Sequence, residues 1–108
     1  MASEAVIQNA GRRLAAAATS PATVILFGSH AEGRARADSD LDLLVIQRGD
    51  LDRSAEFIRL RRALRGLGVP IDLILVSEDD VDQWRDVPGT LIHHVVREGR
   101  TLVAGGPA

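Results

Sequence analysis

The sequence predicts an α/β (α+β) protein in which helices flank a small mixed sheet. Apolar runs of strand length alternate along the 108 residues with segments of helical periodicity. This length allows one domain with a single core. We assign the domain to residues 1–104 and expect residues 105–108, which carry only glycine, proline and alanine, to form a frayed C-terminal tail.

The first half is predicted to contain a helix and two strands. Ser3 can cap the helix, which continues to about Ala18, and Pro21 prevents any extension. The apolar face of this helix consists of Val6, Ala10, Leu14 and Ala17. The next elements are a buried strand at 23–27, a tight turn at 28–29, a polar loop or single helical turn at 30–39, and a strand at 41–46.

The second half is predicted to contain two more strands and further helices. Asp50 or Asp52 can cap a helix that ends near Gly66 and Gly68. Its expected buried face consists of Phe57, Leu60, Leu64 and Leu67. The remaining elements are a strand at 71–76, a helical turn from Ser77 to about Asp86, a helix at 90–97 and an edge strand at 101–103. The strands at 41–46 and 71–76 are expected to be central, because they are apolar nearly throughout.

The composition excludes several kinds of chemistry. The chain has no cysteine, so it has no disulfide, thiolate metal site or cysteine nucleophile, and it has no lysine nucleophile because it has no lysine. A net charge of −2 gives no general attraction to nucleic acid, which we do not expect to bind directly. No apolar stretch reaches the roughly 18 residues of a membrane span, so we expect a cytoplasmic protein without membrane contact.

Two aspartates at the start of the second strand indicate a metal site. Side chains alternate along a strand, so Asp40 and Asp42 point to the same face. Like charges this close repel unless a cation separates them, and Mg²⁺ or Mn²⁺ prefers such oxygen ligands. The alternative is that Asp38, Asp40 and Asp42 are ordinary turn and cap residues.

A third aspartate and a glycine turn strengthen this interpretation. Asp72 is the one charge in a strand expected to be buried, where an unpaired carboxylate is costly. An arginine partner for Asp72 is the alternative to a metal shared with Asp40 and Asp42. Gly28 lets a phosphate approach the backbone, and the Ser29 hydroxyl with the following N–H groups can bind its oxygens.

Gly28-Ser29, ten residues, Asp40-X-Asp42 and a later Asp72 together resemble the motif of the DNA polymerase β-like nucleotidyltransferase superfamily. The segment 28–45 is most similar to the minimal nucleotidyltransferases, antitoxin-type members of that superfamily. The resemblance covers most of the chain and implies the polymerase β-like nucleotidyltransferase fold. It also implies two Mg²⁺ ions (Mn²⁺ as a substitute) on Asp40, Asp42 and Asp72, ATP as the substrate, and Gly28 and Ser29 as ligands of its phosphates.

The resemblance implies transfer of a nucleoside monophosphate, AMP from ATP, to a hydroxyl of a protein partner. The partner expected from the family is a small helical HEPN-type protein, the toxin of a toxin–antitoxin pair. One alternative is a catalytically weak binding or scaffold subunit of such a pair, and another is the catalytic subunit of a small-molecule nucleotidyltransferase. A homo-oligomer is possible with any of these three functions.

One position departs from the family motif. Family members often carry arginine where this chain has Glu32, and Arg34 or Arg36 is expected to supply the missing positive charge near the triphosphate. His30 is a further candidate for a triphosphate contact. A basic helix face, formed by Arg59, Arg61, Arg62 and Arg65, is either a docking surface for an acidic partner or RNA or a solvated helix face.

Overall fold

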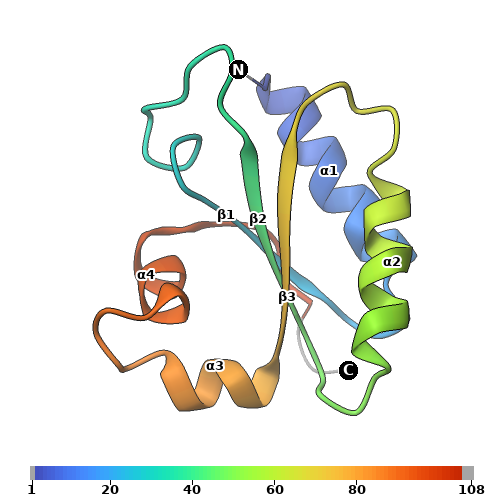
Figure 1. The fold of residues 1–108 in the computed structure, drawn as a ribbon, viewed down its shortest axis with the longest axis vertical. Helices are drawn as coiled ribbons and strands as arrows, with labels where there is room; N and C mark the ends of the chain where they lie inside the picture. The colour runs from blue at the N-terminus through green and yellow to red at the C-terminus, as the bar shows by residue number, and fades with distance from the viewer. Residues whose placement is uncertain (1, 106–108) are drawn as a thin grey trace.

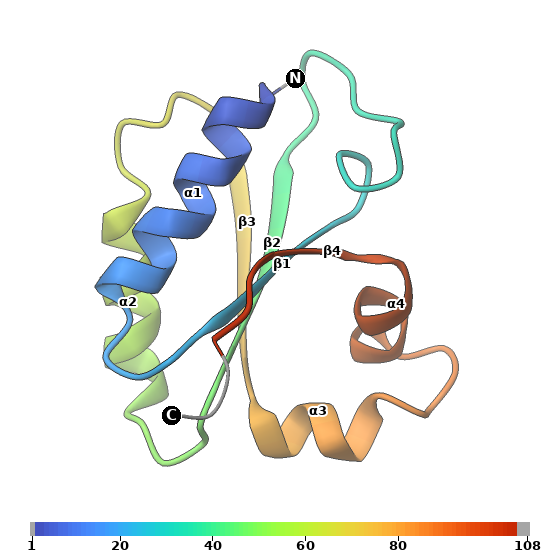
Figure 2. The same ribbon diagram turned by 180° about the vertical axis from the view of Figure 1, so that it is seen from behind.

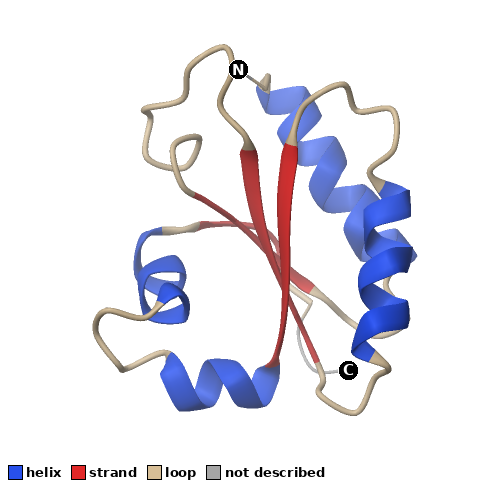
Figure 3. Cartoon of the chain, in the orientation of Figure 1, coloured by secondary structure: helices blue, strands red, loops and turns tan. Residues whose placement is uncertain are grey.

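The computed structural model describes residues 2–105 and shows a four-stranded mixed sheet with helices packed against it (Figure 3). The elements in chain order are α1 (Glu4–Ala17), β1 (Thr23–Phe27), β2 (Leu41–Gln47), α2 (Arg53–Ala63), β3 (Ile71–Ser77), α3 (Glu78–Trp84), α4 (Leu91–Glu98) and β4 (Arg100–Val103). The predicted α/β fold class is therefore confirmed, with each expected strand present.

The strands lie in the order β3-β2-β1-β4. β1 pairs antiparallel with β2 and β4, whereas β2 and β3 are parallel and α2 connects them. β4 forms one edge, as expected. The expectation that the strand at 71–76 is central is wrong, because β3 forms the other edge and β1 is central instead.

Two layers of helices cover the sheet (Figures 1 and 2). α1 and α2 lie on one face, and α3 and α4 lie on the other. The larger core lies under α1 and α2, where Leu41, Leu43 and Val45 of β2 are fully buried. The smaller core joins Ile25, Phe27 and Leu44 to Val95 of α4. Because side chains alternate along β2, Asp42 lies on the α3–α4 face together with Leu44.

The helix caps predicted from the sequence are confirmed. The Ser3 hydroxyl accepts the Val6 N–H at 3.2 Å, and the Asp52 carboxylate accepts the Ala55 N–H at 3.1 Å. Ser77 and Asp80 form a reciprocal capping box at the start of α3. The buried residues of α1 are Ile7, Ala10, Gly11 and Leu14, so Ile7 takes the central place that the periodicity gave to Val6.

The predicted buried face of α2 is wrong at one residue. Leu60 and Leu64 are buried, but Phe57 is 36% exposed. Glu56 is buried in its place, at 4% exposure. Hydrogen bonds explain why α2 turns Glu56 toward the core in place of Phe57. The Glu56 carboxylate accepts hydrogen bonds from the Thr19 N–H at 2.8 Å and from Gln47 Nε2 at 2.9 Å. A polar partner on a distant segment thus outweighs the apolar side chain next to it.

Of the four residues assigned to the tail, only Gly105 is described. Its carbonyl accepts a hydrogen bond from Thr23 Oγ1 at 3.4 Å. The remaining part of the predicted tail, residues 106–108, lies outside the described residues. No helix in the described range 2–105 has the length and apolar character needed to cross a membrane.

Candidate active site

The glycine turn after β1 is shaped around an aspartate. Gly28 has φ +76°, a conformation that residues with a Cβ rarely adopt. A Cβ at this position would collide with Asp42 Oδ2. Asp42 is the residue that pairs with Phe27, the last residue of β1. The Asp42 carboxylate therefore occupies the space that a side chain at position 28 would need.

The parallel pairing of β2 and β3 brings two of the predicted aspartates together. Asp42 pairs with Asp72 in register, and neighbouring strands lie about 4.8 Å apart. Asp40 lies just before β2 and is exposed. Gly28, Asp42 and Asp72 thus come from three strand ends that meet at the same end of the sheet (Figure 1).

The expectation that Asp72 is buried is wrong. Asp42 is half-buried, but Asp72 is exposed. β3 is an edge strand, and Asp72 lies at the end of β3 opposite to α3, which begins after Ser77. Asp72 therefore needs no buried partner, and it is accessible to a reactant from solvent.

The three aspartate carboxylates interact with one another electrostatically. Burial raises the pKa of Asp42, and the negative charges of Asp72 and then Asp40 raise that pKa further, while His30 opposes the shift. A site of this kind favours either a proton or a metal ion beside Asp42. A divalent cation bound here would neutralise the repulsion between these carboxylates.

The donor set fits a hard divalent cation, because it consists of carboxylate oxygens held at one end of the sheet. Within residues 2–105, no three histidine, aspartate or glutamate side chains converge closely enough to hold an ion in the conformation described. Ionised carboxylates repel each other in the absence of a counter-charge, so convergence of Asp40 and Asp72 on Asp42 requires side-chain rotation. The backbone positions already place all three residues on adjacent segments.

His30 is fixed by the backbone on both sides of its ring. Its Nε2 accepts the Ala2 N–H at 3.1 Å, which places the ring proton on Nδ1. Nδ1 then donates to the Asp40 carbonyl at 3.0 Å. Both nitrogens are engaged, so His30 supports the Asp40 backbone and is not free to bind a triphosphate. Local sequence patterns do not predict this role, because His30 bonds to residues that lie 28 and 10 positions away in the chain.

Glu32 and Arg34 form an ion pair in the loop after the glycine turn. Arg34 Nη2 lies 3.3 Å from Glu32 Oε1, and His94 Nε2 of α4 lies 3.6 Å from Glu32 Oε2. The positive charge that the sequence assigned to nucleotide binding is thus directed at Glu32. Ser29 is half-buried, and its carbonyl accepts the Arg34 N–H at 2.8 Å, which closes the loop.

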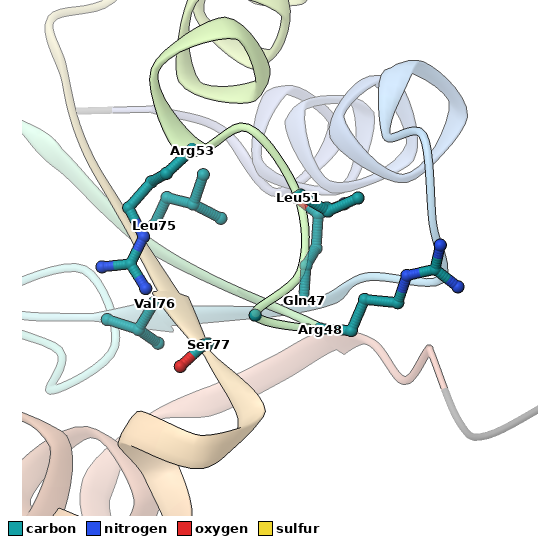
Figure 4. Close-up of a pocket in the computed structure, with 8 residues that line it drawn as sticks. Gln47, Arg48, Leu51, Arg53, Leu75, Val76 and Ser77 are labelled. Atoms are coloured by element: carbon teal, nitrogen blue, oxygen red, sulfur yellow. The ribbon is translucent and has the colours of Figure 1, made fainter.

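A small cavity lies at the opposite end of the sheet, between the ends of β2 and β3 (Figure 4). Its volume is about 10 Å³, which suffices for about one water molecule. Gln47 and Ser77 line this cavity. It is too small for a nucleotide, so it does not compete with the carboxylate end of the sheet as the active site.

Known proteins resemble this chain in sequence and in fold. Residues 12–105 match the family described as Polymerase beta, Nucleotidyltransferase. The "Putative protein adenylyltransferase MJ0604" of Methanocaldococcus jannaschii is 33% identical over 79 residues, which span 73% of this chain and 75% of that protein. A solved chain, "Structure of putative minimal nucleotidyltransferase", is 39% identical, with a TM-score of 0.52 over 89% of this chain and 84% of that one.

A chain from "Crystal structure of the toxin-antitoxin with AMP-PNP" is alike in fold, with a TM-score of 0.64 at 23% identity over 90% of this chain and 73% of that one. Fold and sequence together place the protein among enzymes that transfer phosphorus-containing groups. It belongs to the polymerase beta nucleotidyltransferase family, and it is a nucleotidyltransferase.

Proposed function

We propose that the protein transfers AMP from ATP to a hydroxyl group of a partner protein in a Mg²⁺-dependent reaction. The observation that carries this proposal is the in-register pair of Asp42 and Asp72 beside the Gly28 turn, whose shape leaves room for the Asp42 carboxylate. The similarity to a named protein adenylyltransferase supports ATP and a protein acceptor.

In this proposal, Asp40, Asp42 and Asp72 hold Mg²⁺, with Mn²⁺ as a substitute. The metal, when bound, neutralises charge on the attacking and leaving oxygens. The backbone N–H groups after Gly28 and the Ser29 hydroxyl bind the phosphates of ATP. Arg34 contributes to nucleotide binding only when it leaves Glu32.

In the proposed reaction, Asp72 acts as the general base. The acceptor hydroxyl forms a bond to the α-phosphorus of ATP, and the bond from that phosphorus to the bridging oxygen breaks. Pyrophosphate leaves with the electron pair of that bond. Asp72 accepts the proton of the acceptor hydroxyl, because it is the exposed member of the carboxylate pair.

The proposed acceptor is a small helical protein of HEPN type, so that the chain acts as the antitoxin of a toxin–antitoxin pair. The family resemblance supports this part of the proposal. The likeness to a chain of a toxin–antitoxin structure is one of fold and is in keeping with it.

The test is transfer of label from α-labelled ATP to the purified partner in the presence of Mg²⁺. Asp42→Asn should reduce the transfer by about 10²-fold or more, whereas Asp38→Asn should leave it intact, because Asp38 is an exposed aspartate of the same loop outside the carboxylate pair. Label transfer by Asp42→Asn at the wild-type rate would refute the proposed role of this residue.

A second candidate function is a catalytically weak scaffold that neutralises the partner by contact. The ion pair between Glu32 and Arg34 favours it, because this pair withdraws positive charge from a triphosphate. Stable binding of the partner without any transfer of label would favour the scaffold.

A further inference from the structure

Within residues 2–105, the outer side of β3 carries backbone N–H and C=O groups that pair with no other strand. The Leu41 N–H donates to the Pro70 carbonyl at 2.9 Å, and Leu41 pairs with Ile71. In a parallel ladder, alternate residues of a strand direct their N–H and C=O groups to the same side. The residues of β3 whose backbone N–H and C=O groups point toward β2 are therefore Asp72, Ile74 and Val76. The residues whose backbone groups point outward are Ile71, Leu73, Leu75 and Ser77.

Side chains cap both ends of this outer row. Arg61 Nη1 donates to the Ile71 carbonyl at 3.0 Å, and Asp80 Oδ2 accepts the Ser77 N–H at 3.0 Å. Within residues 2–105, no hydrogen bond engages the outward groups of Leu73 or Leu75. The open part of the edge is thus a two-residue window centred on Ile74.

An apolar groove runs beside this window. It has a volume of about 470 Å³ and lies between α2 and the edge of β3, which faces the viewer in Figure 1. Phe57 and Ile58 of α2 line the groove and are 36% and 51% exposed. An open strand edge next to exposed apolar side chains is typical of a surface that pairs with another strand.

We propose that a second copy of this chain pairs its β3 antiparallel with this edge, about a two-fold axis at Ile74. In that register Leu73 lies opposite Leu75 of the second copy, and Leu75 lies opposite Leu73. Each of these pairs exchanges both backbone hydrogen bonds, because all of the residues involved direct their groups outward. The window is therefore complementary to itself, as a two-fold interface requires.

The charges at the two ends of the edge match the same arrangement. Arg61 and Arg65 lie near the start of β3, and Glu78 and Asp79 follow its end. Antiparallel pairing brings the basic end of one copy beside the acidic end of the other. Arg53 is already paired with Asp80 at 3.1 Å, so the acidic residues that meet the arginines of the second copy are Glu78 and Asp79.

The helices extend the contact. An axis through the sheet at Ile74 places the α2 helices of both copies on the same face, running antiparallel. Ile58 lies at the middle of α2, as Ile74 lies at the middle of β3. Phe57 and Ile58 of one copy would therefore meet the same residues of the other, which covers their exposed apolar surface.

Sedimentation equilibrium of the full chain from micromolar to millimolar concentration tests the association. The expected result is a reversible monomer–dimer equilibrium. Amide hydrogen exchange identifies the surface. The N–H groups of Leu73 and Leu75 should gain protection as concentration rises, whereas Asp72 and Ile74 are protected by β2 at every concentration.

Two variants and one control complete the test. Leu75→Pro removes an outward N–H and leaves the ladder with β2 intact, so it should weaken dimerisation by about tenfold or more. Ile58→Glu should weaken dimerisation through the helix contact, without changing the strand. Leu91→Glu is the control, because it replaces an equally exposed apolar residue, 45% exposed, on α4.

A monomer at all concentrations overturns the proposal. A dimer that survives both variants, or that protects other amides, also overturns it. Protection of Leu73 and Leu75 only on addition of a different protein would assign the edge to that partner instead.

Discussion

Replacing Gly28 with alanine tests whether the glycine turn exists to make room for the Asp42 carboxylate. The added Cβ would collide with Asp42 Oδ2, so the carboxylate must rotate or the turn must shift. Gly28 also has φ +76°, at which any residue with a Cβ is strained. The substitution therefore combines a backbone cost with a displaced Asp42 carboxylate.

A matched control separates these two effects. Gly33 lies in the same loop with φ +72°, but a Cβ there meets no atom of the described residues 2–105 within 4 Å. Each alanine should cost about 1–2 kcal/mol of folding free energy through backbone strain. Only Gly28→Ala should also reduce transfer, by about 10²-fold, which is the effect of misplacing a reacting group by about 1 Å.

The assay is label transfer from ATP as a function of Mg²⁺ concentration, with a thermal melt of each variant. Gly28→Ala should need more Mg²⁺ for half-maximal transfer, and Gly33→Ala should follow the wild-type curve. Equal transfer rates and equal Mg²⁺ dependence in the two variants would refute the argument that the space beside Gly28 positions Asp42.

Three further predictions follow from charges. Asp42→Asn should reduce transfer by about 10²-fold or more. It should also raise the melting temperature of the metal-free protein by about 2–5 °C, because it removes charge repulsion at a site where the carboxyl pKa is raised. An unchanged melting temperature would contradict this repulsion. Burial raises the pKa of Glu56, but hydrogen bonds from Thr19 and Gln47 outweigh it, so the pKa is lowered from its ordinary value of 4.5. The stabilisation from the ionised Glu56 carboxylate is thus present above pH 4.5 and is lost as pH falls through the folded pKa. In urea titrations at several pH values, Glu56→Gln should lower the free energy of unfolding by about 1–3 kcal/mol at neutral pH. The variant should also lose less stability than the wild type as the pH falls below 4.5. Glu32→Arg should lower the KM for ATP by about fivefold, since it replaces a negative charge with a positive one and releases Arg34. An unchanged KM would show that this loop does not contact the triphosphate.

Local signals predicted most of the fold. The caps at Ser3 and Ser77 each depend on a donor within three residues, so the sequence alone identifies them. For α2 the sequence leaves Asp50 and Asp52 as candidates, and the structure selects Asp52. The strands were predicted for the same reason, since each is a short apolar run between turn residues. The sequence also predicts that Asp42 and Asp72, which lie on two successive strands, share one site, and the structure adds that they pair in register.

Contacts between distant segments could not be predicted. An apolar run does not distinguish an edge strand from a central one, so β3 and the exposure of Asp72 were assigned incorrectly. Glu56 is buried because Thr19 and Gln47 donate to it, and neither is its neighbour in the chain. The bridge from His30 to Asp40 depends in the same way on how the loop folds back.

Paramagnetic broadening of amide signals by Mn²⁺ in the presence of ATP tests the central claim most directly. If Asp40, Asp42 and Asp72 hold the metal, the first signals to broaden should be those at 28–29, 40–42 and 72, and Asp42→Asn should abolish the effect. Broadening that starts instead at the acidic first turn of α3, Glu78–Asp80, would contradict the assignment of the metal site.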